Sequence, residues 1–362
     1  MDTAASRPSL HPLPDRIIPG QPPTALAPMQ DITGHSFMHL LAICGAPDYY
    51  ITEYYRVHDS SRLDVDIRRC ICENTTGRPI IAQIIGEDPV HIRRAARELA
   101  PLPIAGIDLN LGCPAPKVFR KNVGGGLLRD PARVNEILAV LREESPGTLS
   151  VKMRYGFEDD SNFDTFLEII DRHNVDLVSL HARTVRQLYR GQPDYSYITR
   201  AAKALRCPVL ANGDIGSCEK AARVLKETGA FGAMIGRPAV RNPWIFRQCR
   251  EHFAGLSVFK PTLADVREYV DRLWEVTDEK GLSDDKHIPR MKKLLNFIAL
   301  GVDEEGAFLR AMRLTQTKSE LMNLCDECLL ENGNADKLFA PDAHAHLIAR
   351  PNHEGPEKQT CE

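Results

Sequence analysis

The chain has 362 residues, with 46 Lys and Arg against 49 Asp and Glu, and 43% of its residues are hydrophobic. This length exceeds one average domain, and the near balance of charge excludes a protein that is basic over its whole surface. No apolar run approaches the roughly 20 residues of a membrane-spanning helix, so we expect no membrane association.

The N-terminal 23 residues contain six prolines and no apolar signal core, so we expect residues 1–23 to form a disordered lead-in. Ten scattered cysteines without an export signal predict free thiols and a cytoplasmic location. Cys325 and Cys328 form a CxxC, but no second pair follows, and they continue the apolar helical stripe of Leu321 and Leu324. We therefore predict no metal.

Short apolar runs alternate with amphipathic stretches from residue 25 to about residue 254. The predicted strands are Ala25–Met29, Tyr49–Glu53, Ile80–Ile84, Ala105–Asn110, Leu149–Lys152, Leu177–His181, Val209–Asn212 and Ala233–Gly236. Predicted helices between them include 88–100, 130–145, 162–174 and 217–229, several with Asp or Ser at the N-cap position. This alternation predicts an α/β fold, a closed (β/α)8 TIM barrel over residues 24–256. A doubly wound Rossmann sheet would need a GxGxxG turn after its first strand, where the sequence is instead APMQDITGHS.

After Gly255 the strand pattern stops. Thr262 and Asp265 predict a capping box at the start of a helix that ends at Gly281, and the stretches 289–300, 304–317 and 318–330 are amphipathic. We expect a small C-terminal helical bundle domain over residues 260–345, followed by a disordered tail at 350–362.

Chemistry in a barrel of this kind sits at the carboxyl ends of the strands. Polar or ionisable residues end six of the eight predicted strands, and the residues at the eight ends are Met29, Glu53, Gln83, Asn110, Lys152, His181, Asn212 and Gly236. Any one of these could be a solvated strand end, but their convergence on one mouth predicts a site.

The last two strand ends suggest a phosphate pocket. Asn212, Gly213 and Asp214 form one turn, and Gly236 and Arg237 form the next. Glycine amides and an arginine at these positions favour an anion, although glycines also simply end strands. A lysine such as Lys152 suits the N1/O2 edge of a flavin and Gln83 suits its N3/O4 edge, but barrel lysines also form Schiff bases or ordinary ion pairs.

Cys113 follows the fourth strand in NLGCPAPKV, where the flanking Gly112, Pro114 and Pro116 place it on a loop. A thiol with an ordinary pKa near ~8.5 is protonated at neutral pH and can act as a general acid. Gly124–Gly126 lack the Lys and Ser/Thr of a P-loop, so we expect a turn of close backbone approach.

Positive charge gathers near the predicted mouth and in the bundle. Seven Lys and Arg lie between residues 286 and 318 against three acids, and the mouth loops add Lys117, Arg120, Lys121, Arg183, Arg186, Arg190, Arg237 and Arg241. Although solvated helix faces are often this charged, the combination favours a polyanionic substrate.

These residues resemble the bacterial tRNA-dihydrouridine synthase family. The matching stretches, in family order over residues 25–250, are APMQDITG, ITEYY, AQIIG, DLNLGCPAPKV, VKMRYG, HARTVRQLYRG, ANGDI and MIGRPAVRNPWIF. The resemblance implies FMN-dependent, NADPH-driven reduction of the C5=C6 bond of a uridine in tRNA, with hydride passing from flavin N5 to C6 and a proton from Cys113 to C5. It implies FMN contacts from Pro28, Met29, Gln30, Gln83, Lys152, His181, Asn212, Gly213, Asp214, Gly236 and Arg237.

The same resemblance makes tRNA the partner of a protein that we expect to be a monomer. The uridine must be flipped out to reach the mouth, and the candidate tRNA contacts are Asn110, Lys117, Arg120, Arg183, Arg186, Arg290, Lys292 and Lys293. The alternatives are an FMN-dependent dehydrogenase of a free pyrimidine, for which a second basic domain has no use, and a non-catalytic RNA-binding barrel.

Overall fold

A parallel β-barrel forms the larger part of the protein in the computed structural model, which describes residues 9–278 and 282–341. Its strands are β1 (Thr24–Leu26), β2 (Tyr49–Ile51), β4 (Ile80–Ile85), β5 (Gly106–Leu111), β6 (Thr148–Arg154), β7 (Leu177–His181), β8 (Val209–Asn212) and β9 (Gly232–Ile235). β1 pairs with β9 and β2 pairs with both β1 and β4, so the sheet closes on itself. The predicted (β/α)8 fold is confirmed, with one unpredicted short strand, β3 (Tyr55–Arg56), beside β4.

Alternate residues of each strand point into the barrel, because successive side chains of a strand face opposite sides. The lower interior is a separate apolar core that includes Tyr49, Ile81, Leu177, Leu210 and Met234. Strands β4 to β7 also carry polar side chains that are fully buried, namely Gln83, Asp108, Ser150 and Ser179. The interior thus becomes polar toward the carboxyl ends of the strands.

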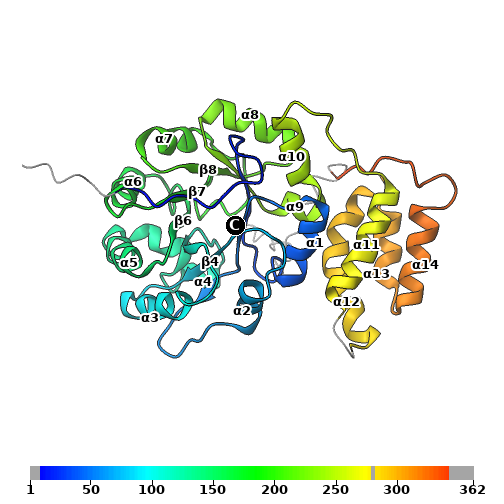
Figure 1. The fold of residues 1–362 in the computed structure, drawn as a ribbon, viewed down its shortest axis with the longest axis horizontal. Helices are drawn as coiled ribbons and strands as arrows, with labels where there is room; N and C mark the ends of the chain where they lie inside the picture. The colour runs from blue at the N-terminus through cyan, green and yellow to red at the C-terminus, as the bar shows by residue number, and fades with distance from the viewer. Residues whose placement is uncertain (1–8, 279–281, 342–362) are drawn as a thin grey trace, which may run out of the picture.

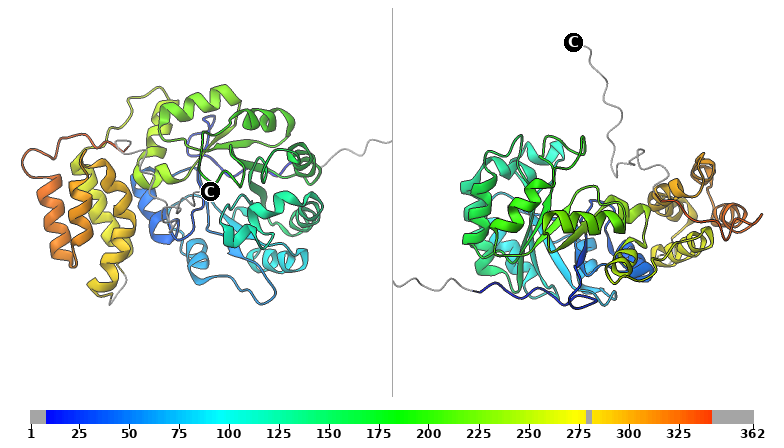
Figure 2. Two further views of the ribbon diagram at one scale, coloured as in Figure 1. Left: turned by 180° about the vertical axis from the view of Figure 1, so that it is seen from behind. Right: turned by 90° about the horizontal axis from the view of Figure 1, so that it is seen from above.

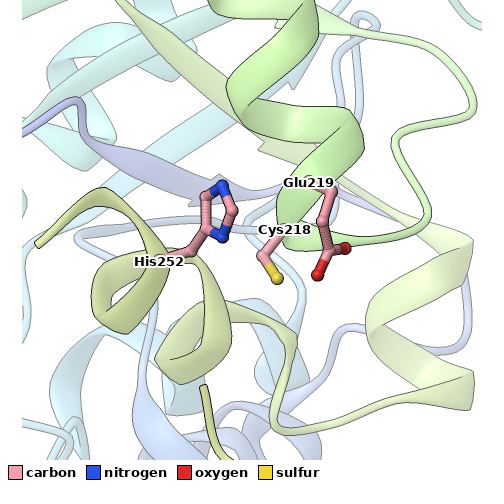
Figure 3. Close-up of side chains that lie close together, drawn as sticks. All are labelled: Cys218, Glu219 and His252. Carbon is pink, nitrogen blue, oxygen red and sulfur yellow. The ribbon is translucent and has the colours of Figure 1, made fainter. Parts of the chain in front are cut away.

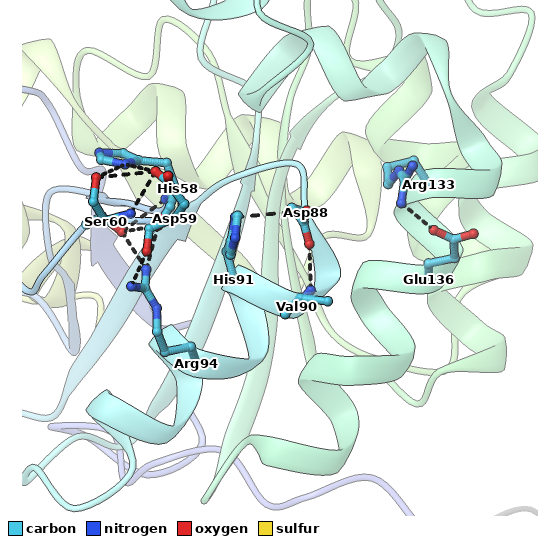
Figure 4. A network of polar contacts seen from close by, with 10 residues as sticks. His58, Asp59, Ser60, Asp88, Val90, His91, Arg94, Arg133 and Glu136 are labelled. Carbon is cyan, nitrogen blue, oxygen red and sulfur yellow. Dashed lines mark hydrogen bonds and ion pairs between the residues drawn. The ribbon is translucent and has the colours of Figure 1, made fainter.

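Helices surround the barrel (Figure 1). They are α1 (His35–Gly45), α2 (Val65–Cys72), α3 (Pro89–Leu99), α4 (Pro116–Phe119), α5 (Pro131–Glu144), α6 (Phe163–Arg172), α7 (Ser196–Ala204), α8 (Cys218–Thr228), α9 (Arg237–Arg241) and α10 (Ile245–Phe253). The expected N-caps are present on α3, α5 and α8, where Asp88, Asp130 and Ser217 accept hydrogen bonds from first-turn amides. Figure 4 shows the Asp88 cap, together with Arg94 of α3 holding the turn at His58 and Asp59.

The lead-in differs from its prediction. Backbone N–H groups of His11 and Ile17 donate to the carboxylates of Asp176 (2.6 Å) and Asp48 (2.7 Å), which precede β7 and β2. Residues 9–23 are therefore fixed to the amino-terminal end of the barrel, and the expectation of disorder is wrong for them, because these carboxylates satisfy their backbone donors. Residues 1–8 lie outside the described part.

Within the described residues, a bundle of four helices packs against one side of the barrel near α1, α9 and α10 (Figures 1 and 2). They are α11 (Leu263–Thr277), α12 (Asp284–Ile298), α13 (Ala307–Leu314) and α14 (Lys318–Leu329). The capping box of Thr262 and Asp265 is present, and Trp244 of the barrel lies 6.2 Å, between ring centroids, from Tyr269 of α11. The predicted helix end at Gly281 and the tail at 350–362 fall outside the described residues, as do positions 342–345 of the expected bundle.

The start of α12 differs from its prediction, whereas the packing of the CxxC agrees with it. α12 begins at Asp284 rather than at Pro289, so Pro289 lies in the second turn of the helix, where it removes one backbone hydrogen bond. Both cysteines of the CxxC lie on α14. Cys325 is buried in the apolar core and Cys328 is partly buried against it, as the packing interpretation predicted. No helix in the described ranges is long and apolar enough to span a membrane.

Candidate active site

A cavity of about 560 Å³ opens at the carboxyl ends of the strands. Seven of the eight residues singled out at the predicted strand ends line it, namely Met29, Glu53, Asn110, Lys152, His181, Asn212 and Gly236. Pro28, Gln30, Cys113, Gly213, Asp214 and Arg237 line it as well. Phe297 of α12 forms part of the wall, so the barrel and the bundle both contribute to the cavity.

The turns after β8 and β9 form one end of the cavity. Gly213 has φ +127°, which favours glycine, and Asn212 Nδ2 donates to the carbonyl of Met234 on β9 at 2.8 Å. A Cβ atom at Gly236 would lie only 3.3 Å from Ala27 Cβ and 3.5 Å from Met29 Sδ. The two glycines therefore keep a backbone cradle open, as an anion-binding turn requires.

Asp214 lies between two arginines in this end of the cavity. Its carboxylate accepts hydrogen bonds from Arg183 Nη1 at 3.1 Å and from Arg237 Nη2 at 3.2 Å. Although burial opposes ionisation, the two guanidinium groups hold the pKa of Asp214 below its usual value. Arg237 also lies 4.2 Å from the ring centroid of Tyr189, so its side chain is held on two sides.

Arg183, which the sequence predicts to contact tRNA, is buried, and its contact with tRNA stays a prediction. Its side chain is only 1% exposed, and besides Asp214 it donates to the carbonyl oxygens of Arg190 and Gly191. A buried guanidinium needs partners for its donors, and these are supplied by the neighbouring loop and strand end. Arg183 therefore supports the turn that contains Asp214.

The centre of the cavity is basic. Burial, aided by nearby Arg154, lowers the pKa of Lys152 to about 8, despite the opposing effect of Asp108. Burial and the positive charges of Arg154 and Lys152 hold the pKa of His181 well below its usual value, so the imidazole is neutral at physiological pH. Among the described residues, His181 Nδ1 and Arg237 Nη1 are buried without a hydrogen-bond partner. Their unmet hydrogen-bonding capacity fits a polar ligand.

Cys113 is partly buried on the loop that follows β5. Burial raises the pKa of its thiol, although a hydrogen bond from the backbone of Ala115 and nearby cations such as Lys152 oppose the rise. The glycine run forms a 3-10 helix, Gly124–Arg129, against this loop, and the Gly125 amide donates to the carbonyl of Cys113 at 3.3 Å. A Cβ atom at Gly124, where φ is +57°, would lie 3.1 Å from Cys113 Cβ. This is the turn of close approach that the sequence predicts.

Gln83 is buried inside the barrel and is not among the residues that line the cavity. Its side chain is 0% exposed, with Nε2 donating to Asp108 at 2.7 Å and Oε1 accepting from Asn110 at 2.8 Å. Asn110 Oδ1 in turn accepts from the backbone N–H groups of Gly112 and Cys113. Gln83 thus belongs to a chain of hydrogen bonds from the barrel interior to the Cys113 loop, and its contact with a flavin stays a prediction.

Several cavity residues were not among those predicted from the sequence, and three of them are polar or aromatic groups in its wall. Arg154 is 2% exposed and holds the loops after β5 and β7 through the carbonyls of Gly112, Thr184 and Leu188. It stands two residues beyond Lys152, so strand alternation could have predicted it. Tyr54 and Tyr189 also line the cavity. Both lie on loops, where no periodicity predicts the direction of a side chain.

Glu53 is an ionisable group in the wall near the bundle. Its carboxylate accepts from the backbone N–H groups of Asp31 at 2.7 Å and Ile32 at 2.9 Å, and Asp31 has φ +61°. Burial raises the pKa of Glu53 to about 7, although these hydrogen bonds and the charge of Lys293 on α12 oppose the rise. Glu53 therefore anchors the turn after Met29 and Gln30.

The remaining residues predicted to contact tRNA lie in three places: the first cavity, a second cavity and helix α12. Lys117 lines the first cavity, whereas Arg120 and Arg186 line a second cavity of about 550 Å³. On α12, Lys293 and Arg290 are exposed, but the Lys292 ammonium donates to the carbonyls of Arg313 and Thr315 at the end of α13. Lys292 is thus engaged in holding two helices together.

Comparison with known proteins places this geometry in a family. The family model described as Dihydrouridine synthase (Dus) matches residues 25–334. The chain belongs to the dihydrouridine synthase family. It is 35% identical over 240 residues to tRNA-dihydrouridine synthase B of Pseudomonas aeruginosa, covering 65% of this chain and 69% of that protein. It is 38% identical over 244 residues to a probable tRNA-dihydrouridine synthase of Helicobacter pylori strain J99, covering 66% and 72%.

A third relative, a probable tRNA-dihydrouridine synthase of Rickettsia bellii, is 29% identical over 297 residues, covering 80% of this chain and 89% of that protein. The family match spans the whole first cavity and all four helices of the bundle. The barrel mouth and the adjoining bundle of this dihydrouridine synthase thus both lie within the family's own extent.

One side-chain cluster of this dihydrouridine synthase bears on the prediction of no metal. Cys218 and Glu219 at the start of α8 and His252 on α10 place one ligand atom each within 4.8 Å of one another (Figure 3). Among the described residues this is the single group of its kind. Burial and the contact with Glu219 raise the pKa of Cys218 to about 12, so its thiol is protonated at neutral pH. The absence of a metal stays a prediction.

Proposed function

We propose that this protein is a tRNA-dihydrouridine synthase, an oxidoreductase that reduces the C5=C6 bond of a uridine in tRNA with NADPH as the reductant. The names of its relatives support the substrate and the reaction. The observation that carries the proposal is the position of Cys113, a protonated thiol that lines the same cavity as the two anion-binding turns.

The cavity fits FMN. Its volume lies in the range of cofactor sites, and the open cradle at Gly213 and Gly236 with Arg237 suits a phosphate. Lys152 and the unpartnered His181 Nδ1 offer donors to the ring system, and Pro28, Met29 and Gln30 offer wall contacts. When bound, FMN would supply the hydride that reduces C6 of the uracil.

The residues of the chain supply the remaining chemistry. Because burial raises the pKa of Cys113, its thiol keeps a proton that it can transfer to C5 of the uracil. Lys152 and His181 can donate hydrogen bonds to O4, where negative charge develops as C6 is reduced. The neutral state of His181 leaves Lys152 and Arg154 as the cations in this part of the cavity.

The substrate must be flipped out of the folded tRNA to enter the cavity. Lys117 at the rim and the exposed Lys293 and Arg290 on α12 can contact phosphates around it. Because the proposed substrate is tRNA, we expect a cytoplasmic protein that acts as a monomer; both are predictions.

Purified protein, NADPH and an unmodified tRNA transcript test the proposal. We expect a yellow protein with FMN absorbance and the appearance of dihydrouridine in the RNA, measured by mass spectrometry of nucleosides. Free uridine and dihydroorotate serve as controls for a free-pyrimidine enzyme. A colourless protein that takes up no FMN, or turnover of only the free pyrimidine, would contradict the proposal.

A further inference from the structure

The second cavity, on the rim of the barrel, has no part in the chemistry described above. It lies among α4, the 3-10 helix Gly124–Arg129 and the loop after β6, and it is lined by Phe119, Arg120, Leu128, Arg129, Gly156, Phe157, Glu158, Asp159, Ser161, Asn162 and Arg186. Two of these, Arg120 and Arg186, were predicted from the sequence to contact tRNA. From its contents and position, we infer that this cavity binds a nucleotide of the tRNA strand next to the reacting uridine.

The contents suit a nucleotide with both its base and its phosphate. The Arg186 guanidinium lies 6.0 Å from the ring centroid of Phe119 and 5.7 Å from that of Phe157, so planar groups on which a base can stack line the cavity. Arg129 lies 4.4 Å from the Phe157 ring and donates to the carbonyls of Gly126 and Phe119, which keeps it in place.

The charges also favour a nucleotide over a free phosphate. The cavity has three arginines and two carboxylates, and Glu158 is already paired with Arg186 at 3.1 Å. The Arg120 guanidinium makes no hydrogen bond or ion pair with another residue in the described ranges, so it is available for a phosphate. Asp159 and Asn162 can accept hydrogen bonds from base amino groups.

The position of the cavity relates it to the reacting uridine. Lys117 of α4 lines the first cavity, whereas Phe119 and Arg120 of the same turn line the second. One helical turn rises only about 5 Å, so neighbouring nucleotides can reach both cavities. α5 and α6 lie on the side of the barrel away from the bundle, and α4 lies between them and α2 (Figure 1). A strand held here and a tRNA body held by α12 would thus contact the enzyme on both sides of the mouth.

This inference rests on the proposed function, and its test separates the two. Arg120→Gln and Arg186→Gln are compared with Arg133→Gln, in which an exposed arginine paired with Glu136 on α5 is changed in the same way (Figure 4). Binding to unmodified tRNA is measured over a range of KCl concentrations. We expect each cavity variant to bind about three- to tenfold more weakly with a salt slope shallower by about one, and the Arg133 variant to match the unaltered protein.

A photo-crosslinking amino acid in place of Arg120 locates the strand. A crosslink to a nucleotide adjacent to the one converted to dihydrouridine supports the inference, and a crosslink only elsewhere overturns it. Unchanged affinity and salt slope in both cavity variants would also overturn it, whether or not product forms. Absence of dihydrouridine with the unaltered protein contradicts the proposed function instead.

Discussion

Asn110 Oδ1 accepts a hydrogen bond of 3.0 Å from the backbone nitrogen of Cys113, and so a buried strand residue fixes the loop that presents the thiol. Because Asn110 is itself held by Gln83, and Gln83 by Asp108, the position of the thiol is determined by the barrel interior rather than by the loop alone.

Asn110→Ala should therefore lower dihydrouridine formation by about 10- to 100-fold, because a misplacement of about 1 Å is enough to slow a positioned reaction. Asn110→Asp keeps the acceptor for the Cys113 amide and should lie between Ala and the unaltered protein. The pH dependence of Cys113 alkylation reports the loop directly. An Ala variant with an unaltered alkylation profile and rate of product formation would show that Asn110 does not position the thiol.

Cys113→Ala should lower product formation by about 10²- to 10⁴-fold, the usual contribution of a positioned general acid. The variant should still bind FMN and be reduced by NADPH, measured as bleaching of the flavin absorbance, because the phosphate turns are untouched. Cys72→Ala, which removes an exposed thiol on α2, is the control and should behave like the unaltered protein. Normal product from Cys113→Ala would eliminate the assigned acid.

Glu53→Gln should change the pH dependence of stability. The pKa of Glu53 is about 7 in the folded protein and is ordinarily 4.5, so the folded state holds this proton more tightly than the unfolded chain. The resulting stabilisation is present below pH 4.5 and is lost as the pH rises through 7. We expect the Tm of the variant to equal that of the unaltered protein at about pH 5 and to exceed it at about pH 8.

Glu136→Gln, which changes an exposed carboxylate on α5, provides the comparison for that experiment. It should show no such pH-dependent gain. A Glu53 variant whose Tm follows that of the unaltered protein at every pH would mean that Glu53 titrates normally.

Lys152→Met should raise the thermal stability of the flavin-free protein and lower its affinity for FMN. Burial lowers the pKa of Lys152 from 10.5 to about 8, so the folded state disfavours the charged form. The penalty is present at neutral pH and disappears as the pH rises toward 10.5. We expect a Tm higher by roughly 2–4 °C at neutral pH, measured by calorimetry, and faster loss of FMN on dialysis. A lower Tm would indicate that the ammonium is well paired.

Lys292 and Lys293 should respond differently to the same change. Lys293→Gln removes an exposed charge and should weaken tRNA binding in a salt-dependent way with little change in Tm. Lys292→Gln removes the donor to the carbonyls of Arg313 and Thr315 and should lower Tm. Filter binding and thermal unfolding of both variants give the comparison, and identical effects would contradict the division of roles.

The sequence by itself determined the barrel, most of the cavity wall and the helical bundle. Strand alternation and helix caps are local signals, and the closed parallel barrel brings every strand end to one mouth, so Lys152, His181, Asn212 and Gly236 could be placed together without coordinates.

Only the tertiary structure decided which of two neighbouring side chains of the same type is buried or paired and which is exposed. Arg183 and Arg186 belong to one loop, but Arg183 meets Asp214 from another strand end and is buried, whereas Arg186 faces solvent. Lys292 meets the end of α13 and Lys293 does not, because successive helical residues point about 100° apart. Such outcomes depend on partners distant in the sequence, and a single sequence contains no periodic signal for them.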